Sequence, residues 1–189
     1  MLKIEKIAEL SQVELELLYI GFQQKWEKLL KKRTFQEFCR LYQSTDSRER
    51  YYRIMEAGEL AGVFGISGFF SRKKQVKGHK KQVSDWRWYF GKELLNDSVA
   101  RNECYLSFLV IGNAFQGQGI GKACLQFIEE QSREKAEIKC VTLFVSTSNQ
   151  RAIALYKRAG FEVDRKVSSL LTKYFVDEKS WYKMKKRLR

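Results

Sequence analysis

The sequence has no proline among its 189 residues, so glycine, asparagine, aspartate and serine must mark its turns. It has one histidine, His79, and its four cysteines form no CxxC pair, so we expect no metal site. No apolar run approaches the roughly 18 residues that a membrane-spanning helix needs. The N-terminus mixes charged and apolar residues, unlike a signal peptide. These absences predict a cytoplasmic protein without a membrane partner.

The residues that are present favour a single domain covering residues 1–189. The length suits one domain. Hydrophobic residues make up 44% of the chain and aromatic residues 14%, whereas disordered chains lack aromatic and β-branched residues. Scattered cysteines in a reducing compartment are usually small buried hydrophobic residues. We expect this role for Cys39, Cys104, Cys124 and Cys140.

The chain is strongly basic, with a formal net charge of +14. Lysine and arginine cluster at residues 25–33, 72–81 and 179–189. Such a surplus fits an anionic partner such as nucleic acid, the ribosome or a polyphosphate ligand. A solvated basic surface is the alternative. The clusters lie far apart and no RNA-binding signature accompanies them, so the second interpretation is favoured.

The first half of the chain predicts a strand, two helices and a pair of strands. Ser11, with Glu14 three residues later, has the pattern of a capping box, which begins a helix running to about residue 25. Gly58 suits the turn of a hairpin. The other expectations are a strand over 2–7, a helix over 34–42, paired strands over 51–55 and 60–70, a basic loop over 72–82 and a short helix over 85–95.

The second half alternates between strands and helices, which argues for a mixed α/β sheet. Apolar positions from Ile120 follow the helical period to about residue 135. A second helix begins at Asn149 and ends at Gly160, which suits the left-handed position after a helix. Strands are expected over 105–111, 141–145, 161–167 and 181–184, with a turn over 113–119.

A glycine-rich turn, Gln116-Gly117-Gln118-Gly119-Ile120-Gly121, joins the strand over 105–111 to the next helix. Backbone N–H groups are free at such a position and the helix dipole is positive there. Glycine lets a bulky anion approach, and a pyrophosphate is the natural guest. The dinucleotide fingerprint fails because residue 122 is lysine, and the Walker A pattern fails because residue 123 is alanine. A plain glycine-rich turn is the alternative.

A second segment, over residues 149–161, follows the next strand with the pattern N-x-x-A-x-x-L-Y-x-x-x-G-F. Together with the turn, which fits Q/R-x-x-G-x-G/A, it resembles the GCN5-related N-acetyltransferase (GNAT) superfamily. The resemblance covers about residues 100–189. It implies an α/β (α+β) fold whose mixed, mostly antiparallel central sheet has a splayed strand pair and flanking helices. It also implies acetyl-CoA as cosubstrate.

The resemblance implies a role for each residue of the cofactor site. The backbones of Leu109 and Ile111 would pair with the pantetheine arm like an added strand, and one amide would polarise the thioester carbonyl. Asn149 would hydrogen-bond the cofactor. The pyrophosphate would be held by the side chain of Gln116 and the backbone amides of Gln118, Gly119, Gly121 and Lys122.

The resemblance also implies the catalytic groups. Tyr156 would protonate the departing thiolate as general acid, although it shares an apolar helix stripe with Leu155 and could instead be a core residue. The position where some family members carry a glutamate base is Tyr105 here. Glu103 lies two residues earlier on the same strand face and is the candidate base, with an ordered water as the alternative.

The sequence leaves the acceptor amine open. A small molecule or a protein amine fits, and the wall around it would come from residues 26–33 and 168–181, with residues 72–95 as a lid. We expect direct attack of a neutral amine on acetyl-CoA, with no acyl group carried by the protein. Cys124 does not suit an acyl carrier, because it lies on an apolar helix face. A non-catalytic acyl-CoA-binding module, or a module that docks on nucleic acid or the ribosome, is the alternative function. A longer acyl group and a homodimer also stay open.

Overall fold

The computed structural model describes residues 1–21, 23, 34–43, 50–68, 100, 102–168, 170 and 178–188. Several expectations fall outside these residues: the end of the first helix, the basic loop over 72–82, the helix over 85–95 and most of the expected acceptor wall. Among the helices in the described ranges, none is both long and apolar enough to span a membrane.

The described strands form one seven-stranded sheet with the order β1-β2-β3-β4-β5-β7-β6. Every neighbouring pair is antiparallel except β4 and β5, which run parallel. The expected mixed, mostly antiparallel sheet is therefore confirmed. The strands are β1 (Lys3–Ile7), β2 (Arg50–Glu56), β3 (Glu59–Ser67), β4 (Glu103–Ile111), β5 (Cys140–Ser146), β6 (Glu162–Ser168) and β7 (Ser180–Arg187).

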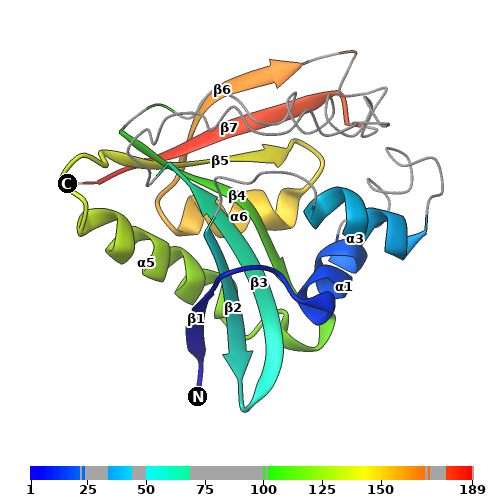
Figure 1. Ribbon diagram of the computed structural model, residues 1–189. Helices are drawn as coiled ribbons and strands as arrows, with labels where there is room; N and C mark the ends of the chain where they lie inside the picture. Colours follow the sequence, from blue (N-terminus) through cyan, green and yellow to red (C-terminus); the bar gives the residue numbers. More distant parts are fainter. Residues whose placement is uncertain are drawn as a thin grey trace, which may run out of the picture.

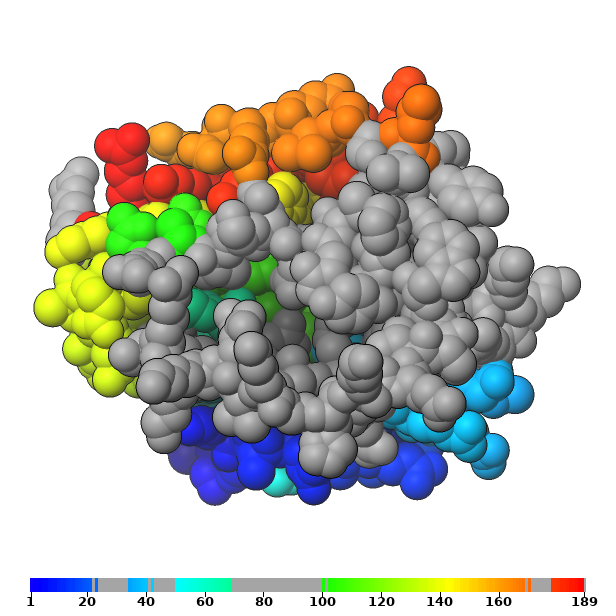
Figure 2. Space-filling view, turned by 45° about the horizontal axis from the view of Figure 1, so that its top comes forward, coloured from blue at the N-terminus to red at the C-terminus, as the bar shows by residue number. Residues whose placement is uncertain are grey.

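Helices cover both faces of the sheet (Figure 1). Buried residues of α5 (Ile120–Arg133) and α6 (Gln150–Arg158) pack with one face of the strands, in a core that contains Phe64, Leu106 and Leu143. Buried residues of α1 (Gln12–Gly21) and α3 (Phe35–Gln43) pack on the opposite face. In the space-filling view of Figure 2, the residues of β6 and β7 lie along one margin and the N-terminal residues, which include β1 and α1, lie along the opposite margin. The sheet therefore separates two apolar cores.

Local signals in the sequence account for several element ends. Glu14 accepts a hydrogen bond from the backbone N–H of Ser11 at 2.9 Å, which is one of the two hydrogen bonds of the expected capping box at the start of α1. Ala57 and Gly58 both have positive φ, 51° and 88°, as a two-residue hairpin turn between β2 and β3 requires. Gly160 has a φ of 87° and follows α6 as expected.

The parallel pair β4 and β5 separates part-way along its length. The two strands pair only from Glu103 opposite Cys140 to Leu106 opposite Leu143, although both continue beyond these residues. Against β3 the register shifts so that Ser107 of β4 has no partner, which is a β-bulge. The expected splayed strand pair is therefore confirmed, and its open end leads into the glycine-rich turn.

Candidate active site

The glycine-rich turn presents free backbone donors. Gly119 is the N-cap of α5 with a φ of 82°, and no side chain caps this helix end. None of the amides over 118–122 donates a hydrogen bond to another described residue. A Cβ built on Gly117 or Gly119 would meet nothing within 4 Å. The turn is therefore an open cradle of N–H groups at the positive end of a helix, which suits a phosphate group.

Gly121 is required for close packing, whereas Gly119 is required for its positive φ. A Cβ at Gly121 would lie 2.9 Å from Cδ2 of Leu155 on α6 and 3.3 Å from Cδ1 of Ile111 on β4. Any side chain here would push α5 away from α6 and from the end of β4. Gly121 therefore keeps the two motif segments in contact, and Gly119 supplies the turn geometry.

The side chain of Gln116 fastens the turn to its surroundings. Its Nε2 donates to the carbonyl oxygen of Ile111 at 3.0 Å and to Oδ1 of Asn113 at 3.1 Å. Its Oε1 accepts from Nη1 of Arg151 at 2.7 Å. The sequence motif placed Gln116 beside the pyrophosphate. It did not indicate a role for Arg151, because that residue occupies an unspecified position of the second motif.

Leu109 and Ile111 lie on the part of β4 that has left β5. On the other side of β4 they pair with Phe64 and Gly62 of β3. Their side chains are half-buried against the core beneath α5 and α6. The β4 edge that faces β5 is therefore unpaired at these residues, so an extended chain could add there as a further strand.

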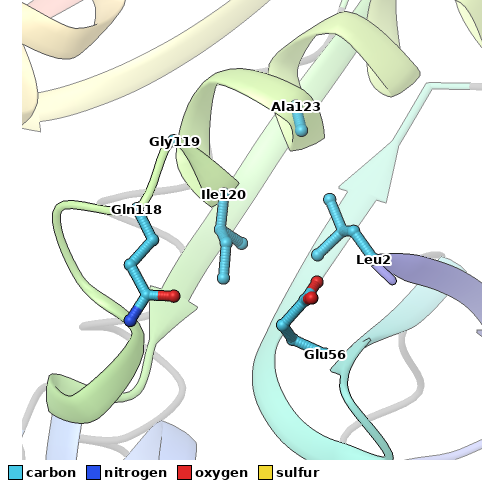
Figure 3. Close-up of a pocket in the computed structure, with 6 residues that line it drawn as sticks. All are labelled: Leu2, Glu56, Gln118, Gly119, Ile120 and Ala123. Atoms are coloured by element: carbon cyan, nitrogen blue, oxygen red, sulfur yellow. The ribbon is translucent and has the colours of Figure 1, made fainter.

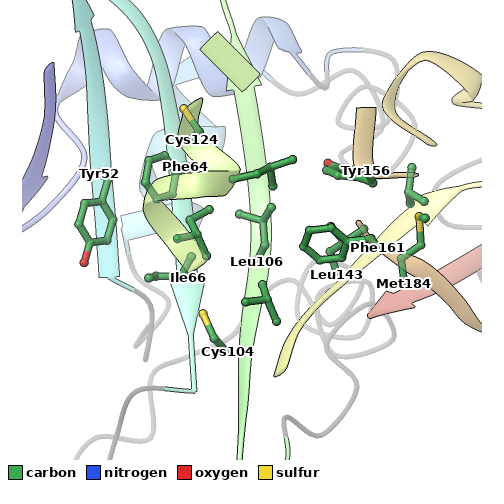
Figure 4. Close-up of a cluster of buried hydrophobic side chains, with 14 of the residues drawn as sticks. Tyr52, Phe64, Ile66, Cys104, Leu106, Cys124, Leu143, Tyr156, Phe161 and Met184 are labelled. Carbon is green, nitrogen blue, oxygen red and sulfur yellow. The ribbon is translucent and has the colours of Figure 1, made fainter. Parts of the chain in front are cut away.

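Tyr156 lies on α6 with a side chain that is only 9% exposed. Figure 4 shows it within the buried cluster, near Phe161, Leu143 and Met184. The ring centroids of Tyr156 and Phe161 lie 6.0 Å apart. Burial raises the pKa of the Tyr156 phenol from about 10 to about 12, so the phenol is protonated at neutral and at mildly alkaline pH. The residue belongs to the core and still carries a proton that it could donate.

Asn149 is the N-cap of α6. Its side-chain oxygen accepts a hydrogen bond from the backbone N–H of Ala152 at 3.1 Å. Asparagine is a favoured residue at this position because it satisfies one of the free N–H groups of the first turn. The side-chain oxygen of Asn149 therefore caps α6. Its side-chain N–H groups are the donors that could contact a cofactor.

Glu103 lies at the opposite end of β4 from the turn. Its Oε2 is 3.5 Å from Nζ of Lys183 and 3.5 Å from Oγ1 of Thr142. At a rise of about 3.3 Å per residue, Glu103 and Leu109 are about 20 Å apart along the strand. The structure therefore separates the candidate base from the cradle and places it on the paired part of the sheet.

The cysteines do not suit nucleophilic catalysis. Cys104 and Cys124 are fully buried, and burial raises the pKa of each thiol to about 12. Cys140 is also buried, and burial raises the pKa of its thiol. Because the thiolate is the nucleophilic form, these three residues are structural, as expected. Cys39, which is half-buried, also has a raised pKa because of burial.

A small hollow of about 240 Å³ adjoins the cradle. Figure 3 shows it between the start of α5 and the ends of β1 and β2. Glu56, on its rim, lies 3.1 Å from the N-terminal amine of Met1. The hollow is lined by Leu2, Glu56, Gln118, Gly119, Ile120 and Ala123. The cradle is therefore accessible from this side of the molecule.

The cradle, the open β4 edge and the second motif on α6 together match a known family. The sequence profile of the acetyltransferase (GNAT) family matches residues 10–161. The chain belongs to the GNAT family. Among the curated relatives, the UPF0157 protein YqkA of Bacillus subtilis is 27% identical over 132 residues, which are 67% of this chain and 37% of the relative. The chain spans less than half of the length of the curated relatives that it matches, 37% and 44%.

Solved structures show that the GNAT chain has the fold of known acetyltransferases. A Bacillus subtilis acetyltransferase in complex with CoA has a TM-score of 0.65 at 13% identity, with all of both chains covered. A spermidine N-acetyltransferase from Vibrio cholerae in complex with CoA and spermine has a TM-score of 0.62 at 15% identity, with 99% of this chain and 95% of that chain covered. At these identities the likeness concerns the fold alone.

Proposed function

We propose that the protein is an N-acetyltransferase that moves the acetyl group of acetyl-CoA to a primary amine by direct attack. The observation that carries this proposal is the open cradle over residues 118–122, which lies directly after the unpaired edge of β4. The two features suit the two parts of CoA, since amides bind the pyrophosphate and a strand edge pairs with the pantetheine amides.

Backbone groups of β4 and of the glycine-rich turn would bind and orient acetyl-CoA. The amides of Gln118, Gly119, Gly121 and Lys122 hold the pyrophosphate. The backbone of Leu109 and Ile111 orients the pantetheine arm, and an amide of β4 polarises the thioester carbonyl. Acetyl-CoA supplies an activated acyl group.

The transfer needs one proton donor and one proton acceptor. A neutral amine attacks the thioester carbon, so that a C–N bond forms and the C–S bond breaks. The Tyr156 phenol, whose pKa is raised to about 12 by burial, donates its proton to the departing sulfur. The proton lost by the amine leaves through ordered water; Glu103, the candidate base that the sequence offers, lies about 20 Å along β4 from Leu109. No acyl group rests on the protein, because Cys104 and Cys124 are buried and protonated.

The proposed acceptor is a primary amine, and its identity is the part that experiment must supply. Proteins with the same fold include a spermidine N-acetyltransferase and a ribosomal-protein-S18-alanine N-acetyltransferase, whose names specify amine acceptors. The net charge of +14 disfavours polycationic acceptors, since like charges repel at the surface. A panel of acceptors should therefore contain neutral and acidic amines as well as polyamines.

The first experiment is a thermal melt of the purified protein with acetyl-CoA, with CoA and with ATP. A ligand at 100 times its Kd stabilises the folded state by about 2.7 kcal/mol, which raises Tm by a few degrees in a domain of this size. We expect a shift with acetyl-CoA and CoA and none with ATP. A panel of amines, assayed by release of CoA, then identifies the acceptor. No shift at millimolar acetyl-CoA would overturn the proposal.

A further inference from the structure

A side-chain hydrogen bond links the segments that follow the two diverging strands. After Leu106 and Leu143, no backbone ladder joins β4 to β5. Gln116 follows the end of β4, and Arg151 lies in the first turn of α6, which follows β5. Nη1 of Arg151 donates to Oε1 of Gln116 at 2.7 Å. The open end of the strand pair is therefore spanned by this hydrogen bond.

The hydrogen bonds of Gln116 fix the direction of its side-chain amide. Its Nε2 group donates to two oxygens, those of Ile111 and Asn113, and only its Oε1 can accept from Arg151. A guanidinium group donates and never accepts, so a flipped amide would lose all three contacts. Arg151 therefore holds Gln116 in the orientation that ties the turn back to the end of β4.

Arg151 has N–H donors beyond the one that binds Gln116. The side chain is exposed, and a guanidinium has five N–H donors. Within the described part of the chain its one hydrogen bond is to Gln116. No ion pair with a described carboxylate competes for it.

We infer that Arg151 is a positioning residue for acetyl-CoA, which acts by holding Gln116 and with it the cradle across the open end of β4 and β5. The inference rests on the proposed function. A cradle that is already ordered before binding loses less conformational entropy when the ligand arrives, and this raises affinity without adding a contact. The expected effect of Arg151 is therefore on cofactor affinity, with little effect on the chemical step.

The test uses the intact protein and four variants: Arg151→Ala, Gln116→Ala, the double variant, and Arg158→Ala. Arg158 lies on the same helix and is exposed, so its variant controls for the loss of one positive charge. Calorimetric titration gives the Kd for CoA, and steady-state assays give kcat and KM for acetyl-CoA. We expect Arg151→Ala to raise Kd and KM by about fivefold to tenfold, as for an exposed charge-assisted hydrogen bond, with kcat within about twofold. Arg158→Ala should match the wild type.

The double variant decides how Arg151 acts. If it acts through Gln116, removing it from the Gln116→Ala protein should change Kd by less than about twofold. A full fivefold to tenfold effect in that background would overturn the inference, since Arg151 would then contact the phosphates by itself. An unchanged Kd in Arg151→Ala, with wild-type protein that binds CoA, would overturn the inference alone. Wild-type protein that binds no CoA would overturn the proposed function as well.

Discussion

Glu103 and Lys183, which come from β4 and β7, form an ion pair across β5, with Oε2 and Nζ 3.5 Å apart and side chains only 12% and 10% exposed. Thr142 of β5 lies between them in the sheet order and contacts the same carboxylate oxygen. Charges removed from water need such partners. The residue that the sequence offers as a base is thus also part of the framework that holds three strands together.

Replacing Glu103 with Gln should lower the free energy of unfolding by about 2 kcal/mol. The change leaves the buried amine of Lys183 without this carboxylate, and breaking a buried pair is costly, although the residual exposure reduces the cost here. Urea unfolding at neutral pH measures the effect. Adding Lys183→Met should recover most of the lost stability, because the buried ammonium group that lost this carboxylate is then absent too.

The same pair of variants separates the two roles of Glu103. If the carboxylate is the base, turnover stays low in the Glu103→Gln/Lys183→Met protein although stability returns. Wild-type kcat in the double variant would contradict a role for Glu103 in proton removal and leave ordered water as the acceptor. Unchanged stability in Glu103→Gln would contradict the importance of the ion pair.

Replacing Tyr156 with Phe should lower kcat by about a hundredfold, the usual contribution of a general acid. The ring keeps its place beside Phe161 and in the core, so Tm and the Kd for CoA should change little. Stopped assays for kcat and calorimetry for Kd provide the two numbers. Wild-type turnover would show that Tyr156 is only a core residue.

The raised pKa of Tyr156 predicts a particular pH dependence. The folded state favours the neutral phenol, so its contribution to stability is complete below the unfolded pKa of about 10. It is lost as the pH rises through the folded pKa of about 12. An acid with this pKa stays competent at neutral and mildly alkaline pH, and kcat should show no decline from Tyr156 up to about pH 10. A decline that begins lower and disappears in Tyr156→Phe would contradict this assignment.

Replacing Gly119 with Ala should weaken CoA binding by at least about tenfold, a loss of roughly 1.4 kcal/mol. The new Cβ would project from the cradle, and a φ of 82° is strained for alanine. Gly58→Ala is the matched control, because Gly58 has a φ of 88° and open space around it but lies in the β2–β3 hairpin. Both variants should lose about 1 kcal/mol of stability, yet only the first should lose affinity. Equal CoA affinities would place the phosphates elsewhere.

Replacing Cys124 with Ala should leave kcat within about threefold of the wild type, since a buried thiol with a pKa of about 12 forms no acyl intermediate. The cost should be a cavity term of about 1 kcal/mol in stability. Mass spectrometry of the protein mixed with acetyl-CoA in the absence of acceptor checks the point directly. A mass increase of one acetyl group that disappears in Cys124→Ala would contradict direct attack.

The sequence predicted the second half of the chain well because the signals there are local. Apolar residues from Ile120 follow the helical period, Asn149 is a helix cap and Gly160 ends the helix. Each of these depends on neighbours a few residues away. In the first half, the strands expected over 2–7, 51–55 and 60–70 and the helix expected over 34–42 lie within a few residues of β1, β2, β3 and α3. In the second half, β4 starts at Glu103 where the sequence suggested Tyr105.

Tyr156 shows what one sequence can leave undecided. The helical stripe predicted a core residue and the motif predicted an acid, and the structure shows a buried phenol that fits both interpretations. Its surroundings, which come from β5, β7 and Phe161, raise its pKa to about 12, so the phenol also keeps its proton at alkaline pH, where an exposed tyrosine begins to lose it.

The sequence by itself determined the family, the order of the elements and the cradle, because periodicity, caps and glycine positions act within a few residues. The tertiary structure alone decided where β4 leaves β5, that Glu103 meets Lys183, and that Arg151 reaches Gln116. These relationships join residues far apart in the chain. Their geometry follows from strand register and helix packing, and no local pattern of residue types encodes either.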